Sequence, residues 1–362
     1  MKNTFGNNVS VTLFGESHGN TIGAVIDGLP AGITVDEEFI ARKLEQRKPV
    51  GKISTPRKEE DRFTIQSGVF NGKTTGTPIC ITIPNENTRS KDYNYGVARP
   101  GHADYTAYSK YNGFEDFRGG GHFSGRVTAG LVAAGAIAID LLSKKGIKIA
   151  THIKNCAGVE DADFNNYESD ISALNNKLFA VLDDSKGEEM QKKIEATALQ
   201  QDSVGGVLET IVSGIPAGVG EPWFDSVESV LSHALFSIPG IKGVEFGCGF
   251  NCAYMTGSQM NDSFFVEEGT IKTKSNNNGG INGGITNGMP IIFRSAVKPT
   301  PSISKEQATV NFVTKENVKT EIHGRHDPCI VHRARVVVDS ITAISICDLL
   351  SQKFGTDWLG EA

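Results

Sequence analysis

Three short segments of this 362-residue chain bring arginine, histidine and a carboxylate or hydroxyl together beside glycine or proline. They are residues 99–104 (RPGHAD), 118–126 (RGGGHFSGR) and 324–328 (GRHDP). Histidine can donate a proton near neutral pH, and arginine binds carboxylates or phosphates through paired hydrogen bonds. Any one such histidine is more often a hydrogen-bonded loop residue. Three such segments in one chain indicate an enzyme that acts on a small substrate with several negative charges.

The segment 118–126 leads into a long apolar run. Residues 127–142 are apolar except for Thr128 and Asp140. A helix that is apolar on every side is either membrane-spanning or buried in a protein core. Because the run is rich in alanine and glycine and falls short of the roughly 20 residues that a span needs, we predict a buried central helix.

The glycine loop before this helix has the features of an anion site. Free N–H groups and the positive end of the helix dipole would lie beside the guanidiniums of Arg118 and Arg126. This combination favours an anion such as phosphate. The alternative is a tight turn whose arginines reach solvent.

Residues 15–19 (GESHG) match the G-x-S-x-G pattern of the nucleophile elbow in α/β-hydrolases, which needs a helix directly after the serine. Residues 9–14 predict a strand, but residues 20–32 are β-like and interrupted by glycine and proline. A serine hydrolase built on Ser17 is therefore not favoured. Asp36 then caps a predicted amphipathic helix over residues 37–46, which ends in a basic corner of the chain.

The composition limits the classes of function. A formal net charge of −6 argues against a nucleic-acid-binding protein, whose domains are usually basic. The N-terminus lacks the apolar region of a signal peptide, so we expect a cytoplasmic protein without a membrane partner. Six cysteines without a CxxC pair indicate free thiols in a reducing compartment. Cys248 and Cys252 could begin a metal site, but no matching pair follows, so we predict no metal.

Two sequence patterns occur twice in the same order. VIDGLPAGI, which begins at Val25, is echoed by IVSGIPAGV from Ile211, and GKTTGTPI from Gly72 is echoed by GITNGMPI from Gly284. Predicted amphipathic helices at residues 37–46 and 224–236 follow the two copies of the first pattern. The duplication predicts two similar layers of sheet and helix packed together in one domain.

The predicted domain comprises residues 1–362, with the two halves at about 9–150 and 203–350. Between them lies a polar insertion at about 161–201, which is helical in pattern over residues 188–200. Near the end we predict a strand at 331–338. Asp339 would then cap a final apolar helix at 341–350.

The motifs resemble those of the chorismate synthase family and occur in that family's order, from about Val11 to Leu350. They are GESHG, RPGHAD, RGGG…SGR…TAG, KPT-x-S and GRHDP. The resemblance implies an α+β fold, a β-α-β sandwich of two internally repeated sheet-plus-helix halves around the central helix, assembled as a homotetramer. It also implies a lyase of the shikimate pathway for aromatic amino acid biosynthesis. That enzyme converts 5-enolpyruvylshikimate 3-phosphate to chorismate by trans-1,4-elimination of phosphate, and it requires reduced FMN without net redox change.

The resemblance assigns roles to particular residues. His18 would protonate the departing phosphate, and His102 would lie beside N1 of the reduced flavin. Asp327 would assist removal of the C6 proton through flavin N5. Ser17 and Ser124 would supply hydroxyl groups near flavin and substrate.

Arginines would hold the phosphate and carboxylates of the substrate, namely Arg47, Arg57, Arg99, Arg126 and Arg325. Flavin contacts are expected from several loops, at His122, Phe123, Ser124, Pro239, Gly240, Gly280, Lys298, Pro299, Thr300, Pro301, Ser302 and Arg325.

The chain departs from the family pattern at two places. Many members have Arg-Ser-Ser where this chain has His122, Phe123 and Ser124, so one cation for the flavin phosphate is missing or replaced. A second basic residue often found after Arg47 aligns with Ile53, beside Lys52. Because no nicotinamide fingerprint is present, NADPH is expected only as an indirect electron source through a separate flavin reductase. The alternative to a separate reductase is that the chain reduces its own flavin. The alternative to an enzyme is a protein that binds a phosphorylated metabolite without catalysis.

Overall fold

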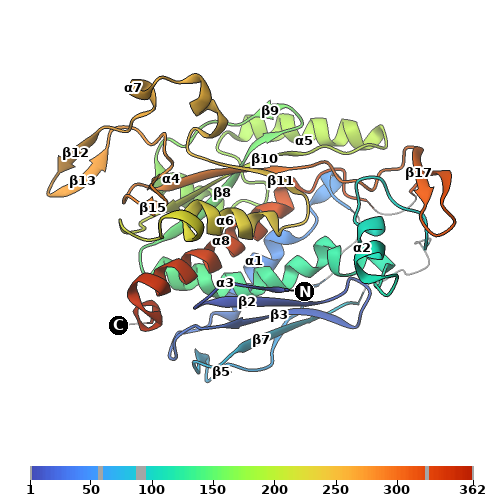
Figure 1. Ribbon diagram of the computed structural model, residues 1–362, viewed down its shortest axis with the longest axis horizontal. Coiled ribbons are helices and arrows are strands. Elements are labelled where there is room, and N and C mark those ends of the chain that lie inside the picture. The colour runs from blue at the N-terminus through green and yellow to red at the C-terminus, as the bar shows by residue number, and fades with distance from the viewer. Residues whose placement is uncertain (1, 56–59, 87–94, 323–325, 361–362) are drawn as a thin grey trace.

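Two antiparallel sheets enclose a layer of helices in the computed structural model, which describes residues 2–55, 60–86, 95–322 and 326–360. Figure 1 shows the first sheet below the helices and the second above them. The first sheet has the order β1 (Thr4–Phe5), β2 (Ser10–Gly15), β3 (Thr21–Asp27), β7 (Ile79–Pro84), β4 (Thr64–Ile65). The second has the order β11 (Ile241–Phe246), β16 (Ile291–Val297), β10 (Gly206–Ser213), β8 (Lys148–Cys156), β9 (Val159–Glu160). This architecture confirms the predicted α+β fold.

Alternation along the strands explains why each sheet covers the helices with one face. In β7 and in β16 every second residue is buried and the residues between are partly exposed. Successive side chains of a strand point to opposite faces, so one apolar face of each sheet packs on the helix layer.

The helix layer contains α1 (Glu37–Arg47), α3 (Thr128–Lys144), α6 (Val227–Phe236) and α8 (Val331–Phe354). Asp36 caps α1 as predicted, accepting a hydrogen bond from Phe39 N at 2.8 Å. The helix predicted at residues 37–46, after the first copy of the repeated pattern, is thus confirmed. In the second copy a 3-10 turn, η5 (Trp223–Asp225), takes up the start of the predicted helix, and α6 begins after a cap at Ser226.

Helix α3 is the predicted buried central helix. A Cβ at Gly130 would lie 2.6 Å from the backbone of Gly23 in β3, and one at Gly135 would lie 2.3 Å from Ser340 Cβ in α8. The small residues therefore let the first sheet and α8 approach α3 closely. Together with the preceding turn, residues 125–144 are apolar and long enough to cross a membrane, but 83 % of the most apolar stretch is buried inside the protein.

Helix α8 corrects two predictions. Residues 331–338, predicted as a strand, and 341–350, predicted as a separate helix, belong to one continuous helix. Asp339 does not cap a helix but lies buried in the middle of α8, where it accepts a hydrogen bond from Thr151 Oγ1 at 2.7 Å. Nearly the whole length of α8 is buried. Tertiary packing on all sides outweighs the preference of its β-branched run for strands.

The carboxylate of Asp348 joins α8 to the beginning of the chain. It accepts hydrogen bonds from Asn7 N at 3.0 Å, Asn8 N at 2.7 Å and Val9 N at 3.0 Å. Because Asp348 is buried, these three donors satisfy its oxygens where water cannot reach them.

The two repeated patterns build matching turns. Thr74 Oγ1 donates to Pro30 O and accepts from Ile33 N. In the second half Thr286 Oγ1 donates to Pro216 O and accepts from Val219 N in the same way. The repeated sequences therefore form the same hydrogen-bonded turn twice. The exact limits of the two halves stay a prediction.

The polar segment between the halves lies against the outer face of the second sheet. It contains α4 (Tyr167–Asn175) and α5 (Asp184–Leu199), and the latter confirms the helical pattern seen there. Ile171 and Leu174 pack on Ala150 and Ile211 of the sheet.

Shorter elements complete the chain: η1 (Gly51–Ile53), β5 (Val69–Phe70), β6 (Lys73–Thr74), α2 (Asp104–Tyr111), η3 (Arg118–Phe123), η4 (Gly125–Val127), η6 (Gly249–Tyr254), α7 (Gly257–Met260), β12 (Phe264–Glu267), β13 (Thr270–Thr273), β14 (Ile281–Asn282), β15 (Ile285–Thr286), β17 (Gln307–Asn311), β18 (Glu316–Thr320) and η7 (Thr356–Leu359).

A buried ion network attaches this segment to the second sheet. His152 Nδ1 lies 2.8 Å from Asp161 Oδ2, and His152 Nε2 lies 3.1 Å from Glu209 Oε1. Burial lowers the pKa of His152, but hydrogen bonds to the two carboxylates outweigh burial and raise it above its ordinary value. Asp161 also accepts from Leu182 N and Asp183 N. The network thus holds the polar segment in place.

Candidate active site

A glycine loop lies at the centre of the candidate site. In η3 (Arg118–Phe123) the three glycines have φ of 62°, 82° and 53°, a left-handed region that other residues rarely adopt. A Cβ at Gly119 would lie 2.6 Å from the His18 ring, and one at Gly120 would lie 3.0 Å from the His102 ring. The bare backbone therefore lets two imidazoles approach the same loop.

Ser17 and His18 follow β2 and are both buried. Ser17 N donates to Gly121 O at 3.0 Å, which holds the turn against the glycine loop. Within the described ranges the Ser17 hydroxyl has no hydrogen-bond partner. A buried polar atom without a partner needs an explanation, and a ligand oxygen would supply one. The chain continues into β3, not into a helix, so the G-x-S-x-G pattern does not form a nucleophile elbow.

His102 is held by an aspartate two residues further along. Its Nδ1 lies 2.7 Å from Asp104 Oδ1, and Arg99 donates to Asp104 through Nε at 2.8 Å and Nη2 at 2.7 Å. Burial raises the pKa of Asp104, but the hydrogen bonds from Arg99 and His102 outweigh it and hold this pKa well below its ordinary value. Since an ionised carboxylate only accepts, His102 Nδ1 is the donor. Nε2 of His102 is then the nitrogen beside Gly120.

Two predicted substrate arginines meet at a buried carboxylate. Arg47, from the end of α1, donates through Nη2 to Asp61 Oδ2 at 2.9 Å, and Arg126 donates through Nη1 to Asp61 Oδ1. All three side chains are at most 7 % exposed. Burial raises the pKa of Asp61, but the two guanidiniums outweigh it and lower this pKa below its ordinary value. Asp61 is therefore the negative charge that keeps two buried cations adjacent.

Asn85 connects this cluster to the histidine turn. Its Oδ1 accepts from Arg126 Nε at 2.9 Å, and its Nδ2 donates to Glu16 O at 2.9 Å and Gly19 O at 2.8 Å. Ser124 lies at the same corner, where its hydroxyl accepts from Arg126 N at 3.3 Å and caps η4 (Gly125–Val127). Arg126 and His18 are thus positioned by one hydrogen-bonded framework.

Asp327 lies next to the end of α1. Its Oδ1 accepts from Thr55 N at 2.9 Å, and its Oδ2 accepts from Arg333 Nη1 at 2.6 Å. Arg333 Nε in turn donates to Arg47 O at 2.9 Å, which links Asp327 to the arginine cluster. Two other predicted substrate arginines, Arg57 and Arg325, lie outside the described residues.

The predicted flavin loops at 239–240 and 298–302 lie together beside the His102 loop. Lys298 N donates to Gly240 O at 2.9 Å, and Lys298 Nζ donates to Gly101 O. A Cβ at Gly101 would contact Pro301 at 3.4 Å. Thr300 Oγ1 is buried and finds no hydrogen-bond partner among the residues described. Ser302 is also buried, while Pro239 and Pro299 are exposed.

Two remaining flavin predictions have different outcomes. His122 and Phe123 belong to the glycine loop, and His122 Nδ1 donates to Gly15 O at 2.8 Å, which leaves only Nε2 for a ligand. Gly280 lies beside the start of β16, whereas Lys298 follows its end. Seven strand residues at about 3.3 Å each separate them by roughly 20 Å. One chain therefore does not bring Gly280 to the other flavin loops.

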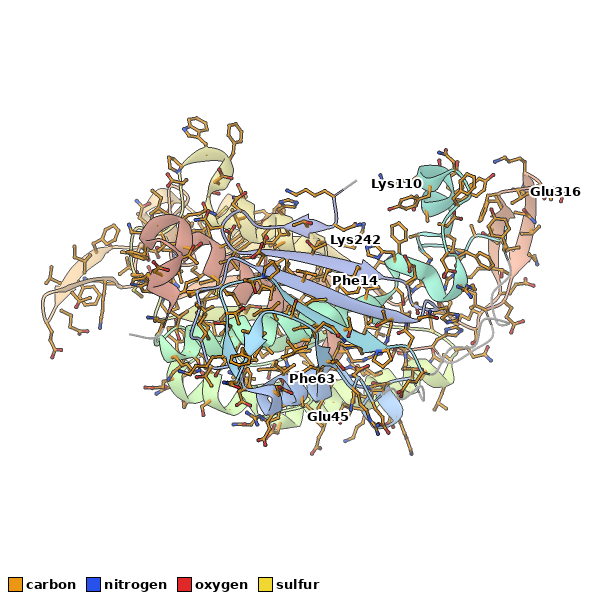
Figure 2. All side chains as sticks on the ribbon, turned by 90° about the horizontal axis from the view of Figure 1, so that it is seen from below. Phe14, Glu45, Phe63, Lys110, Lys242 and Glu316 are labelled. Atoms are coloured by element: carbon orange, nitrogen blue, oxygen red, sulfur yellow. The ribbon has the colours of Figure 1, made fainter. Side chains whose placement is uncertain are left out.

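A cavity of about 550 Å³ opens beside His102 and Gly120. It lies between β2, α2 and the β17–β18 hairpin, and its lining includes Phe14, Phe117 and Phe312. Figure 2 shows Lys110 of α2 and Glu316 of the hairpin at the same end of the molecule. The volume falls within the roughly 300–1,000 Å³ that is usual for small-molecule sites.

The site can bind a polyanion and move protons next to it. Buried guanidiniums and two imidazoles, of His18 and His102, meet around a loop whose backbone is accessible to a ligand, which suits phosphate and carboxylate groups. Sequence reasoning assigned no role to Asp104, although it lies inside the RPGHAD motif, and it missed Asp61 and Asn85, which carry no local signal. No group of three or more His, Cys, Asp or Glu placed to hold a metal occurs in the described part of the chain.

Comparisons with known proteins agree with the sequence resemblance. The model of the chorismate synthase family matches residues 9–350. A protein named chorismate synthase from Dehalococcoides mccartyi is 46 % identical, over 96 % of this chain and 96 % of its own length. Another with the same name, from Lachnoclostridium phytofermentans, is 49 % identical, over 96 % of this chain and 94 % of its own length. A solved structure described as "Crystal Structure of Chorismate Synthase" is 32 % identical with a TM-score of 0.77, over 97 % of this chain and 94 % of that one. From its sequence and its fold, this chain belongs to the chorismate synthase family.

Proposed function

We propose that this chain forms chorismate from 5-enolpyruvylshikimate 3-phosphate by trans-1,4-elimination of phosphate, with reduced FMN bound and no net redox change. The observation that carries the proposal is the approach of His18 and His102 to one glycine loop, beside the buried arginine cluster. Such a site matches a small substrate with a phosphate and two carboxylates.

In this proposal His18 donates a proton to the departing phosphate. Its ring contacts the glycine loop next to the buried Ser17 hydroxyl, which is free to donate to the same phosphate oxygens. Protonation of a leaving group by a positioned side chain contributes on the order of 10²–10⁴ in rate. Asp327, held by Thr55 N and Arg333, is the group assigned to removal of the C6 proton.

Arg47 and Arg126 bind the anionic groups of the substrate. Arg47 Nε is a buried donor without a partner among the described residues, so it is available to a phosphate or carboxylate oxygen. Asp61 holds both guanidiniums in place before the substrate enters. Arg99 donates to Asp104 through both Nε and Nη2, and its assignment to substrate binding rests on the family resemblance.

The loops fit a flavin mononucleotide. Lys298 offers a cation, Thr300 Oγ1 a buried hydroxyl without a partner in the described ranges, and the cavity beside His102 an aromatic wall. His122 replaces the arginine found in many members, and its remaining nitrogen, Nε2, would donate to a phosphate oxygen when the ring is protonated. Reduced FMN would supply electron density to the allylic carbons as phosphate leaves. His102, anchored by Asp104, would place its ring beside the anionic flavin.

A homotetramer follows from the same proposal. Large apolar side chains stand exposed on η5 and η6, at Trp223, Phe224, Phe250 and Tyr254, each more than 80 % exposed. Figure 1 shows α7, which follows η6 in the chain, and the β12–β13 hairpin projecting from the body. Exposed apolar patches of this kind are typical of association surfaces. A neighbouring subunit would also be needed for Gly280 to reach a flavin bound at the Lys298 loop.

We expect the chain to receive reduced flavin from a separate reductase that uses NADPH, and to work in the cytoplasm without a nucleic-acid or membrane partner. The test is an anaerobic assay with photoreduced FMN and 5-enolpyruvylshikimate 3-phosphate, in which chorismate and inorganic phosphate appear in equal amounts. His18→Ala serves as the control for the site. No chorismate with reduced FMN would overturn the proposal. Parallel assays with FMN and NADPH, with and without a reductase, identify the electron source.

A further inference from the structure

Two cysteines far apart in the sequence lie next to each other in the core. Cys156, the last residue of β8, and Cys329, two residues before α8 begins, have their Sγ atoms 3.6 Å apart. Both are free and fully buried. A disulfide needs an S–S distance of about 2.05 Å, so the two sulfurs would have to approach by about 1.5 Å. This movement is within the range of small backbone and rotamer adjustments.

The surroundings of Cys329 stabilise a thiolate. The hydrogen bond between the two sulfurs, together with His332 and Val331 N, outweighs burial and holds the pKa of Cys329 below its ordinary value. The N-terminus of a 24-residue helix favours a negative charge at the same place. Cys347, in the middle of α8, is the opposite case, because burial raises the pKa of its thiol.

We propose that Cys156 and Cys329 form a reversible oxidation site, where a peroxide converts two thiols into a disulfide. The Cys329 thiolate attacks one oxygen of hydrogen peroxide, and the O–O bond breaks to give a sulfenic acid and hydroxide. The Cys156 sulfur then attacks the sulfenic sulfur, and a second hydroxide leaves. Both hydroxides take up a proton, one of them from Cys156, and become water. The two sulfurs together lose two electrons, and the one peroxide gains them.

The disulfide acts on the candidate active site through a short segment. Asp327 lies two residues before Cys329, and Pro328 O accepts from Val204 N at 2.9 Å. Closing the disulfide draws this segment toward β8 and moves Asp327 away from Thr55 N and Arg333. This second step rests on the proposed function of Asp327. A displacement near 1 Å is expected to lower turnover roughly 10- to 100-fold.

The test uses the full chain, treated for hours with hydrogen peroxide because both sulfurs are buried and react only when the segment opens. Alkylation in denaturant and peptide mapping then count the thiols. We expect two of the six cysteines to escape alkylation, in one linked peptide pair that contains Cys156 and Cys329, and dithiothreitol to restore both. Cys156→Ala should remove the linked pair, whereas Cys347→Ala, another buried cysteine, should keep it.

Failure of this inference can be distinguished from failure of the proposed function. If all six thiols react after peroxide treatment, or if only Cys248 and Cys252 become linked, the oxidation site is wrong. If the disulfide forms while the turnover of an active enzyme is unchanged, the connection to Asp327 is wrong. If the reduced protein itself makes no chorismate, the proposed function fails, and peptide mapping still decides on the disulfide.

Discussion

Asp61 is the residue whose loss should disturb the site most directly. Asp61→Asn keeps the size of the side chain but removes the charge that Arg47 and Arg126 share. Arg126 would retain hydrogen bonds to Asn85 Oδ1 and Pro84 O. Among the residues that the structure describes, Arg47 would retain a single long contact of 3.5 Å, to Gly125 O.

The expected loss follows from the burial of the cluster. Removing one partner of a buried ion pair costs about 3–5 kcal/mol, because the remaining charge is left uncompensated. The asparagine can still accept one hydrogen bond, so we expect about 3 kcal/mol. At about 2.1 cal/mol/K per residue, this 362-residue chain unfolds with an entropy near 0.76 kcal/mol/K, and the loss lowers Tm by about 4 °C.

The assay is thermal melting with Asp36→Asn as the matched control. Asp36 also pairs with an arginine, Arg42 at 3.6 Å, but both side chains are substantially exposed. An exposed pair is worth about 0–1 kcal/mol, and asparagine caps a helix as well as aspartate does. The control should therefore melt within about 1 °C of the wild type. Inorganic phosphate should raise the Tm of Asp61→Asn more than that of the control, because an anion replaces the lost carboxylate.

The pH dependence gives a second check on Asp61. Its pKa is lowered in the folded protein, so its stabilising effect is fully present above the unfolded value of about 3.9 and is lost as the pH falls toward the folded value. The Tm difference between the wild type and Asp61→Asn should be constant above about pH 5 and should narrow below about pH 4. Equal melting of the two proteins at neutral pH, without a phosphate effect, would refute the role of Asp61 as the shared counter-charge.

Three further predictions follow from the same geometry. His102→Ala should lower chorismate formation by roughly 10²–10⁴-fold with little change in Tm, and a collapse in Tm would mean that the residue is structural. Gly135→Ala should destabilise the protein by about 1–3 kcal/mol in thermal melting, because the new Cβ would meet Ser340 at 2.3 Å, while Gly257→Ala, which has open space, should change little. His152 has a raised pKa in the folded protein, so the stability it adds is present below about pH 6.5 and is lost as the pH rises through the folded value. His152→Gln should therefore be less stable than the wild type at pH 6, and a difference in melting that does not shrink with rising pH would contradict this.

The sequence predicted the elements that have strong periodicity or strong caps. The apolar run after the glycine loop predicted a helix buried in the core, and α3 is that helix. The helix after Asp36 was identified by its cap. Residues 331–338 were misread because a short apolar run rich in valine fits a buried strand and a buried helix equally well. Only the packing of α8 against its neighbours decides between them.

The candidate site was predictable where its residues belong to motifs. His18 and His102 each follow a glycine or proline turn, and the structure brings both to the same loop. Asp61 was missed because it lies in an ordinary charged stretch and gains its role only when Arg47 and Arg126 approach it from other elements. No local pattern encodes such a meeting.

The hydrogen bonds from residues 7–9 to Asp348 affect how the molecule can fold during synthesis. Their partners are separated by about 340 positions in the chain. At roughly 5–20 residues per second, the ribosome needs about 20–70 s to reach the last helix after the first strand has emerged. During this time the first sheet lacks its anchor, and α3 lacks the helix that covers its Gly135 side. The first half therefore emerges as an incomplete, apolar intermediate that depends on late long-range contacts, and folding of the two halves is completed together.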